Sequence, residues 1–143
     1  MSPVARSVIA IVVGFLVIGV LAFGTDVIVR GAAPEVFAPD GRVDSVPWLL
    51  FMQLYVFVYA VFGCWLAARL APNRPMRHAL ILGLLGLAFN IAGSAAQWDK
   101  MPAWYHLMAL ALVMPAAWVG GRIRERQLAR VGGGSPMSAA TVA

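Results

Sequence analysis

The chain has 143 residues, of which 62% are hydrophobic and only 12% are charged, and its formal net charge is +5. Soluble domains carry roughly 25% charged residues, so this composition excludes an ordinary soluble protein. The charged residues are also unevenly placed, because four long stretches contain almost none of them. Composition and pattern together predict an integral membrane protein.

The four apolar stretches cover, in chain order, residues 7–29, 48–70, 78–96 and 102–121. At a rise of about 1.5 Å per residue, each can cross a hydrocarbon core of about 30 Å. Backbone amides in lipid must be hydrogen-bonded within their own segment, and the alternating pattern of a membrane β-barrel is missing, so each stretch is predicted to be a helix. We predict an all-α integral membrane fold with one transmembrane domain over residues 1–130.

The first stretch has two interpretations. Residues 22–24, Ala-Phe-Gly, have the small residues that a signal peptidase requires, so the stretch has some features of a cleaved signal peptide. Its apolar run is longer than a usual signal-peptide core, and a single basic residue, Arg6, precedes it. These features favour a retained first span.

The connections between the stretches differ in length. The first, residues 31–46, contains the turn sequence Pro39-Asp40-Gly41 and is the only connection long enough to form a lid. The second and third, residues 71–76 and 97–101, are short and predict antiparallel neighbours in a four-helix bundle. Residues 131–143 are rich in Gly, Ser and other small residues and are predicted to form a disordered cytoplasmic tail.

The basic residues predict how the bundle is oriented. Eight of the eleven lie at the N-terminus, the second connection and the C-terminal region, whereas the other side has three. The eight are Arg6, Arg69, Arg74, Arg77, Arg122, Arg124, Arg126 and Arg130; the three are Arg30, Arg42 and Lys100. By the positive-inside rule, both termini are predicted to be cytoplasmic. The basic face is expected to contact anionic lipid, and nucleic acid is not expected as a partner.

Two inner helix ends share an order of residue types. Trp65 precedes Arg69 by four positions in the second stretch, and Trp118 precedes Arg122 by four in the last. A duplicated helical hairpin would explain this similarity. The preferred explanation is convergence, in which Trp lies at the membrane interface and Arg extends outward to the lipid headgroups.

The second connection also carries a resemblance. The run from Trp65 to Ala79, Trp-Leu-Ala-Ala-Arg-Leu-Ala-Pro-Asn-Arg-Pro-Met-Arg-His-Ala, is followed by Gly83. This run resembles the second connection of small uncharacterised bacterial four-helix inner-membrane proteins. The resemblance implies a location in the bacterial inner membrane, and it implies no activity.

Small residues at helical spacing predict where the helices pack. In the third stretch they recur at steps of three and four on one face, which lets a neighbouring helix approach closely. The second stretch has a similar small-residue face. The predicted packing residues are Gly83, Gly86, Gly93, Gly63 and Ala67.

Polar residues of the spans gather in the half of the bilayer opposite the basic face. The predicted pocket there consists of Asp26, Gln53, Tyr55, Asn90, Ser94 and His106. In this interpretation Asp26 and His106 form its titratable pair. The alternative is structural: Asp26 pairs with Arg30 four residues later, and the polar side chains bond neighbouring backbone.

Missing residues exclude several activities. A single cysteine cannot form a redox pair, and the two histidines, His78 and His106, lie on opposite sides of the predicted membrane and so cannot ligate one haem. Proton-coupled export would require a mid-membrane carboxylate, and the spans contain none. No metal site or cofactor is expected.

Two classes of function remain. The preferred one is a non-enzymatic structural or accessory subunit that packs laterally in an oligomer or a larger membrane complex. The alternative is a small binder or transporter of a lipid, quinone or similar apolar molecule that uses the predicted polar pocket.

Overall fold

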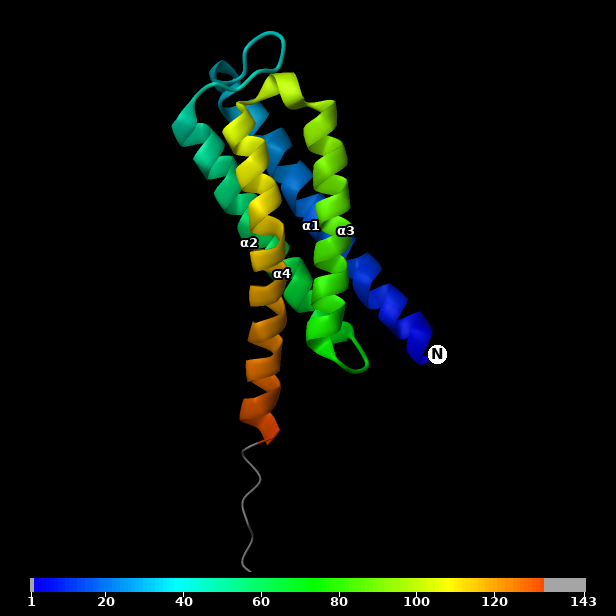
Figure 1. Ribbon diagram of the computed structural model, residues 1–143. Helices are drawn as coiled ribbons and strands as arrows, with labels where there is room; N and C mark the ends of the chain where they lie inside the picture. The colour runs from blue at the N-terminus through cyan, green and yellow to red at the C-terminus, as the bar shows by residue number, and fades with distance from the viewer. Residues whose placement is uncertain (1, 133–143) are drawn as a thin grey trace, which may run out of the picture.

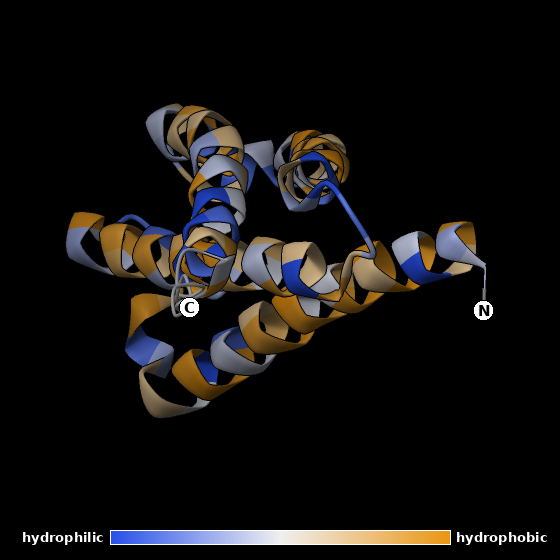
Figure 2. Ribbon diagram, turned by 90° about the horizontal axis from the view of Figure 1, so that it is seen from below, coloured by the Kyte–Doolittle hydropathy of each residue, from blue (hydrophilic) through white to orange (hydrophobic). Residues whose placement is uncertain are grey.

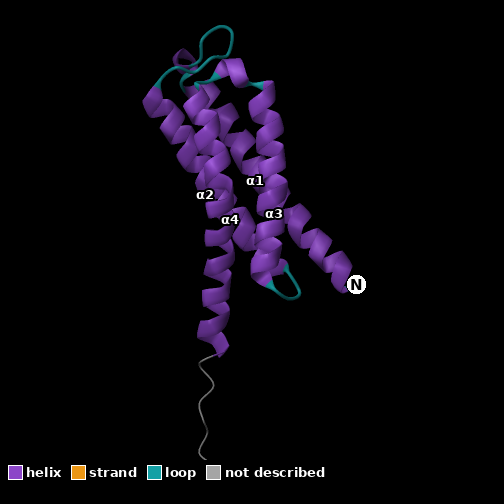
Figure 3. Cartoon of the chain, in the orientation of Figure 1, coloured by secondary structure: helices purple, strands orange, loops and turns teal. Residues whose placement is uncertain are grey.

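The structure is a computed structural model that describes residues 2–132. All regular structure in this range is helical (Figure 3). The elements are α1 (Pro3–Ala32), η1 (Pro34–Val36), α2 (Val46–Leu70), α3 (Pro75–Ala96), η2 (Trp98–Lys100) and α4 (Ala103–Gly132). Each of the four α-helices is long and apolar enough to cross a membrane, so the fold is that of a multi-pass membrane protein.

The helices extend beyond the apolar stretches seen in the sequence. Helix α1 begins at Pro3, where the Ser2 hydroxyl accepts a hydrogen bond of 3.2 Å from the Ala5 amide. Helix α4 continues to Gly132. An apolar stretch indicates only the part of a helix that faces lipid. The backbone hydrogen bonds of the helix continue past that part into the aqueous interface, so the helix is longer than the stretch. The predicted tail loses residues 131 and 132 to α4, and residues 133–143 lie outside the described part of the chain.

Helix α2 packs against α1, α3 and α4, and α3 also packs along α4. In Figure 1 the first and third connections lie at one end of the bundle, and the second lies at the other. We call these the loop end and the tail end. The N-terminal part of α1 diverges from the other helices (Figure 1). Figure 2 shows hydrophobic residues on all sides of the helices, as expected for a bundle surrounded by lipid.

Glycines allow the closest helix contacts in the tail-end half of the bundle. A Cβ atom added at Gly14 of α1 would lie 2.7 Å from the Gly63 carbonyl oxygen of α2. A Cβ added at Gly120 of α4 would lie 2.6 Å from the Val61 carbonyl oxygen of α2. Between these crossings lies a buried cluster of mostly small residues: Cys64, Ala67, Ala68, Ala79, Leu82 and Ala117.

The predicted packing residues have different positions in the structure. Gly63 lies at the α1 crossing, Ala67 is fully buried, and a Cβ at Gly83 would lie 2.4 Å from the Ala117 Cβ. Gly86 is looser, since its added Cβ would be 3.8 Å from Val113.

Gly93 makes no close contact, because an added Cβ would meet nothing within 4 Å. The prediction that Gly93 packs against a neighbouring helix is therefore wrong for the described part of the chain. Successive helical residues turn by about 100°, so Gly93 lies about 80° around α3 from Gly83 and has left the contact.

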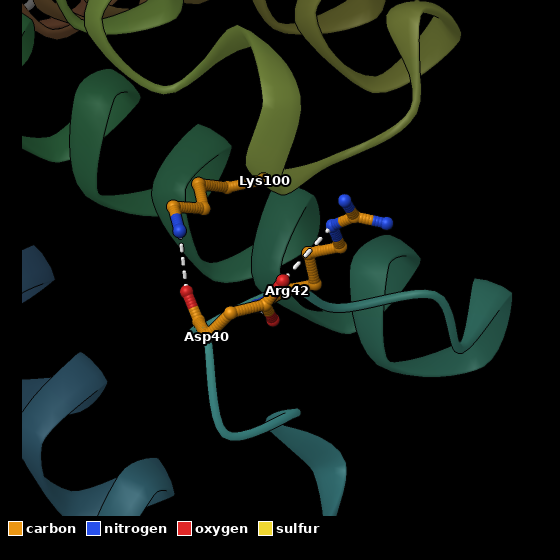
Figure 4. Close-up of polar contacts among 3 residues, drawn as sticks. All are labelled: Asp40, Arg42 and Lys100. Carbon is orange, nitrogen blue, oxygen red and sulfur yellow. Dashed lines mark hydrogen bonds and ion pairs between the residues drawn. The ribbon is translucent and has the colours of Figure 1, made fainter.

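The first connection closes over the loop end. It turns at Gly41, whose φ of +83° suits glycine, and its Val43 side chain is fully buried beside Leu49. The Val43 amide donates to the Lys100 carbonyl at 3.1 Å, and the Lys100 ammonium donates to the Asp40 carbonyl (Figure 4). The first and third connections thus form one cap.

Candidate functional site

A cavity of about 290 Å³ lies among the four helices, and each helix contributes to its wall. Most of the lining is apolar, with aromatic side chains such as Phe15 of α1, Phe57 of α2 and Phe89 of α3. The lining contains two amide side chains, Gln53 and Asn90. The cavity is therefore an apolar chamber with polar groups on α2 and α3.

Gln53 is the most informative residue of the cavity. Its side chain is only 6% exposed, and it forms no side-chain hydrogen bond within residues 2–132. A glutamine amide has two N–H donors and one acceptor oxygen. The amide atoms of Gln53 keep some accessible surface where the residue lines the cavity, so their hydrogen-bonding capacity is free there. A molecule in the cavity that carries a polar group would satisfy the Gln53 amide.

Tyr55 belongs to the predicted pocket but lies on another side of α2. It is two residues beyond Gln53, which places it about 200° around the helix. Its hydroxyl donates a hydrogen bond to the Asp26 carboxylate on α1. A second bond of 3.0 Å joins the hydroxyls of Thr25 and Tyr59. These polar residues connect α1 to α2 and do not line the cavity.

The predicted pair of Asp26 and Arg30 is not formed in the structure. The Arg30 guanidinium lies over the Phe37 ring at 4.4 Å from its centroid, and the partner of Asp26 is Tyr55. The first connection supplies Phe37 at the place where a helical ion pair was expected. Arg30 therefore contacts Phe37 of the first connection, and Asp26 bonds Tyr55 of α2, in place of the expected ion pair between Asp26 and Arg30.

Ser94 and His106 are buried but separate from the cavity lining. The His106 ring stacks on Trp98, with centroids 5.0 Å apart and planes 17° apart, and its Nε2 atom has no hydrogen-bond partner among the described residues. His106 therefore does not pair with Asp26. Of the six predicted pocket residues, the structure brings Gln53 and Asn90 to the cavity.

Sequence reasoning missed Gly14 and Gly120, which permit the closest approaches to α2. A small-residue count could have found Gly120, because it lies in the Gly120-Gly121 pair after Trp118. Gly14 is an isolated glycine in a uniformly apolar helix. The close contact of Gly14 depends on how α1 packs against α2, so no pattern in the sequence around Gly14 predicts it.

The described residues offer little for metal or covalent chemistry. Within residues 2–132, no three His, Cys, Asp or Glu side chains are grouped as a metal site requires. Cys64 lines the cavity near its tail end, but it is 3% exposed and no base is bonded to it in this part of the chain. The arrangement is suited to binding through apolar contact and amide hydrogen bonds.

Comparisons of the chain with protein-family models, curated proteins and solved structures find no match. The resemblance to bacterial four-helix proteins gains no support from them and stays a prediction. The cavity is therefore the feature of the molecule that bears most directly on its function.

Proposed function

We propose that this protein binds one mainly apolar molecule in its central cavity, where Gln53 and Asn90 bond the polar group of that molecule. The observation that carries the proposal is the buried Gln53 amide, which borders the cavity without a partner in the described chain. An amide that lines a mostly apolar cavity with its donors and acceptor free can hydrogen-bond a ligand there, so this position favours a ligand contact.

The size and lining of the cavity support a small or slender ligand. Ligand pockets have volumes of about 300–1,000 Å³, and this cavity is close to the lower limit. Aromatic and aliphatic side chains around a few polar groups are typical of such pockets. A hydrocarbon chain or a small quinone-like ring fits this description.

Native mass spectrometry of the detergent-purified protein tests the proposal. The wild-type protein should retain one small molecule per chain. Gln53→Leu removes hydrogen bonds worth about 0.5–1.5 kcal/mol, so it should reduce retention by up to about tenfold. Gln97→Leu, which changes an exposed amide at the end of α3, is the matched control and should retain the molecule normally.

A second variant tests the cavity by its volume. Gly86→Leu would extend a side chain from the cavity wall, where a Cβ meets only an ordinary contact of 3.8 Å. It should lower retention while the helices remain folded. A wild-type protein without a stoichiometric small molecule, or equal retention in all variants, contradicts the proposal.

We also propose an antiparallel topology with both termini in the cytoplasm. The eight basic residues at the tail end and N-terminus support this orientation through the positive-inside rule. The Arg69 and Arg122 guanidinium groups each lie 5.3 Å from the ring centroid of a tryptophan, an arrangement suited to an anionic lipid interface. A bacterial inner membrane is the proposed location, on the resemblance of residues 65–79 alone.

Lateral association is the second candidate function, as a structural or accessory subunit of an oligomer or larger membrane complex. The N-terminal part of α1 supports it, because it diverges from the bundle (Figure 1) and carries large exposed apolar residues. These include Val4, Val8, Val12 and Leu16, which are spaced four apart along one helix face. Native mass spectra that contain protein oligomers and no small molecule would favour this function over ligand binding.

A further inference from the structure

The wall of the central cavity includes residues that are also exposed on the outside of the bundle. Of the 17 residues that line the cavity, only Gly19 of α1 and Phe89 of α3 are exposed. Phe89 is 60% exposed, and a Cβ atom at Gly19 would meet nothing within 4 Å. Both residues lie well inside helices long enough to span a membrane, so the part of the wall that they form, here called the opening, faces lipid chains.

The two ends of the bundle are closed within the described residues. At the loop end, Val43 of the first connection and Leu49 of α2 are fully buried, and the first connection is bonded to the third. At the tail end, Ala67 and Ala117 are fully buried in the small-residue cluster. The opening between α1 and α3 is therefore the direct route into the cavity.

From this arrangement we infer that an acyl chain of a membrane phospholipid enters the cavity sideways, between α1 and α3, past Gly19 and Phe89. The inference rests on the proposed function, because it concerns the same cavity. Acyl chains are the molecules that a lipid-facing opening meets, and the apolar lining matches their chemistry. The Gln53 amide donates to an ester carbonyl at the end of the chain.

Aromatic side chains shape one edge of the opening. The rings of Phe15 and Phe89 lie with centroids 4.8 Å apart and planes 58° apart, and both residues line the cavity. Few other contacts join α1 to α3, whose stronger partners are α2 and α4. A methylene chain passing between the two helices displaces little protein packing.

Photocrosslinking in vesicles tests the route. The probe is a phosphatidylcholine with a diazirine on one acyl chain, mixed at a low fraction into phosphatidylcholine vesicles that hold the full-length protein. Leu82 lines the cavity and is 1% exposed, whereas Leu84 is 63% exposed on another face of α3. Adducts on Leu82 therefore report chains inside the cavity, and adducts on Leu84 report the surrounding lipid.

We expect adducts on both residues of the wild-type protein. Gly19→Phe should block the opening and lower the Leu82 adducts by about tenfold, with Leu84 unchanged. Gly24→Phe adds the same ring at an open position of α1 outside the cavity and should change neither. Phe89→Ala widens the opening and should raise the Leu82 adducts.

Two results would overturn the inference. Leu82 adducts that do not respond to Gly19→Phe or Phe89→Ala would mean that chains enter elsewhere. Wild-type protein without Leu82 adducts, but with a small molecule retained in native mass spectra, would mean that the occupant is not a phospholipid chain; the proposed function would then stand. Absence of both adducts and retained molecule would refute both.

Discussion

At the scale of single residues, helix packing in this protein depends on where a side chain is missing. Helices in lipid gain little from the hydrophobic effect, so close backbone approach supplies much of their association. Gly14, Gly63 and Gly120 each border a backbone atom of another helix at a distance that no Cβ tolerates. These positions should therefore be the most sensitive to a single added methyl group.

Gly120→Ala should lower the free energy of unfolding by about 1–3 kcal/mol, because its Cβ would be forced against α2 backbone and the Cys64 side chain. Gly93→Ala is the matched control, since the added Cβ meets open space. Alanine is favoured over glycine in a helix by about 0.5–1 kcal/mol, so this control should be neutral or stabilising. Thermal unfolding in detergent measures both. Equal losses at the two positions would contradict the assigned contacts.

Residue positions were only partly predictable from the sequence. Gln53 and Asn90 stand out as amides within apolar stretches, and both line the cavity. Asp26, Tyr55 and His106 stand out equally, yet Tyr55 turns toward Asp26 on α1 and His106 stacks on Trp98. Depth in the membrane can be counted along a sequence, whereas the direction of a side chain depends on how each helix is rotated against its neighbours.

At the scale of elements, the cap made by the first and third connections is the feature that local sequence predicted least. The turn at Gly41 follows from Pro39-Asp40-Gly41 and is present. The buried Val43 residue donates its amide to the Lys100 carbonyl, which lies almost 60 residues later in the chain. The Lys100 ammonium donates in turn to the Asp40 carbonyl, which lies 60 residues earlier. No periodic pattern encodes such a pairing.

Val43→Ala should destabilise this cap. The connection lies beyond the apolar spans, so burial of Val43 removes hydrocarbon from water, and truncating it should cost about 1–3 kcal/mol. Val46→Ala at the start of α2, where the side chain is 50% exposed, is the control and should cost much less. Proteolysis of the first connection in detergent reports local opening, and it should accelerate in Val43→Ala alone. Similar rates in both variants would show that the cap does not depend on Val43.

At the scale of the whole molecule, hydropathy predicted the four membrane-spanning helices well. Four apolar stretches became four long helices, because lipid leaves the backbone few alternatives. The diverging start of α1 and the cavity were not predictable, since both depend on helix crossing geometry. Single glycines such as Gly14 and Gly63 set that geometry.

The proposed topology predicts which sites an impermeant thiol reagent can reach in intact cells. In a Cys64→Ser background, which removes the only native cysteine, Ala38→Cys in the first connection should be labelled. Ala129→Cys near the end of α4 should be labelled only after lysis, because the basic tail end is proposed to be cytoplasmic. Both positions are exposed and uncharged, so the substitutions leave the charge bias unchanged. Labelling of Ala129→Cys in intact cells would contradict the proposed orientation and place the tail end outside the cytoplasm.

The central claim is that the cavity holds an apolar molecule that bonds Gln53. An experimental density map of the full-length protein in lipid nanodiscs tests it most directly. We expect elongated density inside the cavity, touching the Gln53 amide and extending toward the opening between Gly19 and Phe89. A cavity filled by rearranged phenylalanine side chains, with Gln53 bonded to neighbouring backbone, would contradict the claim.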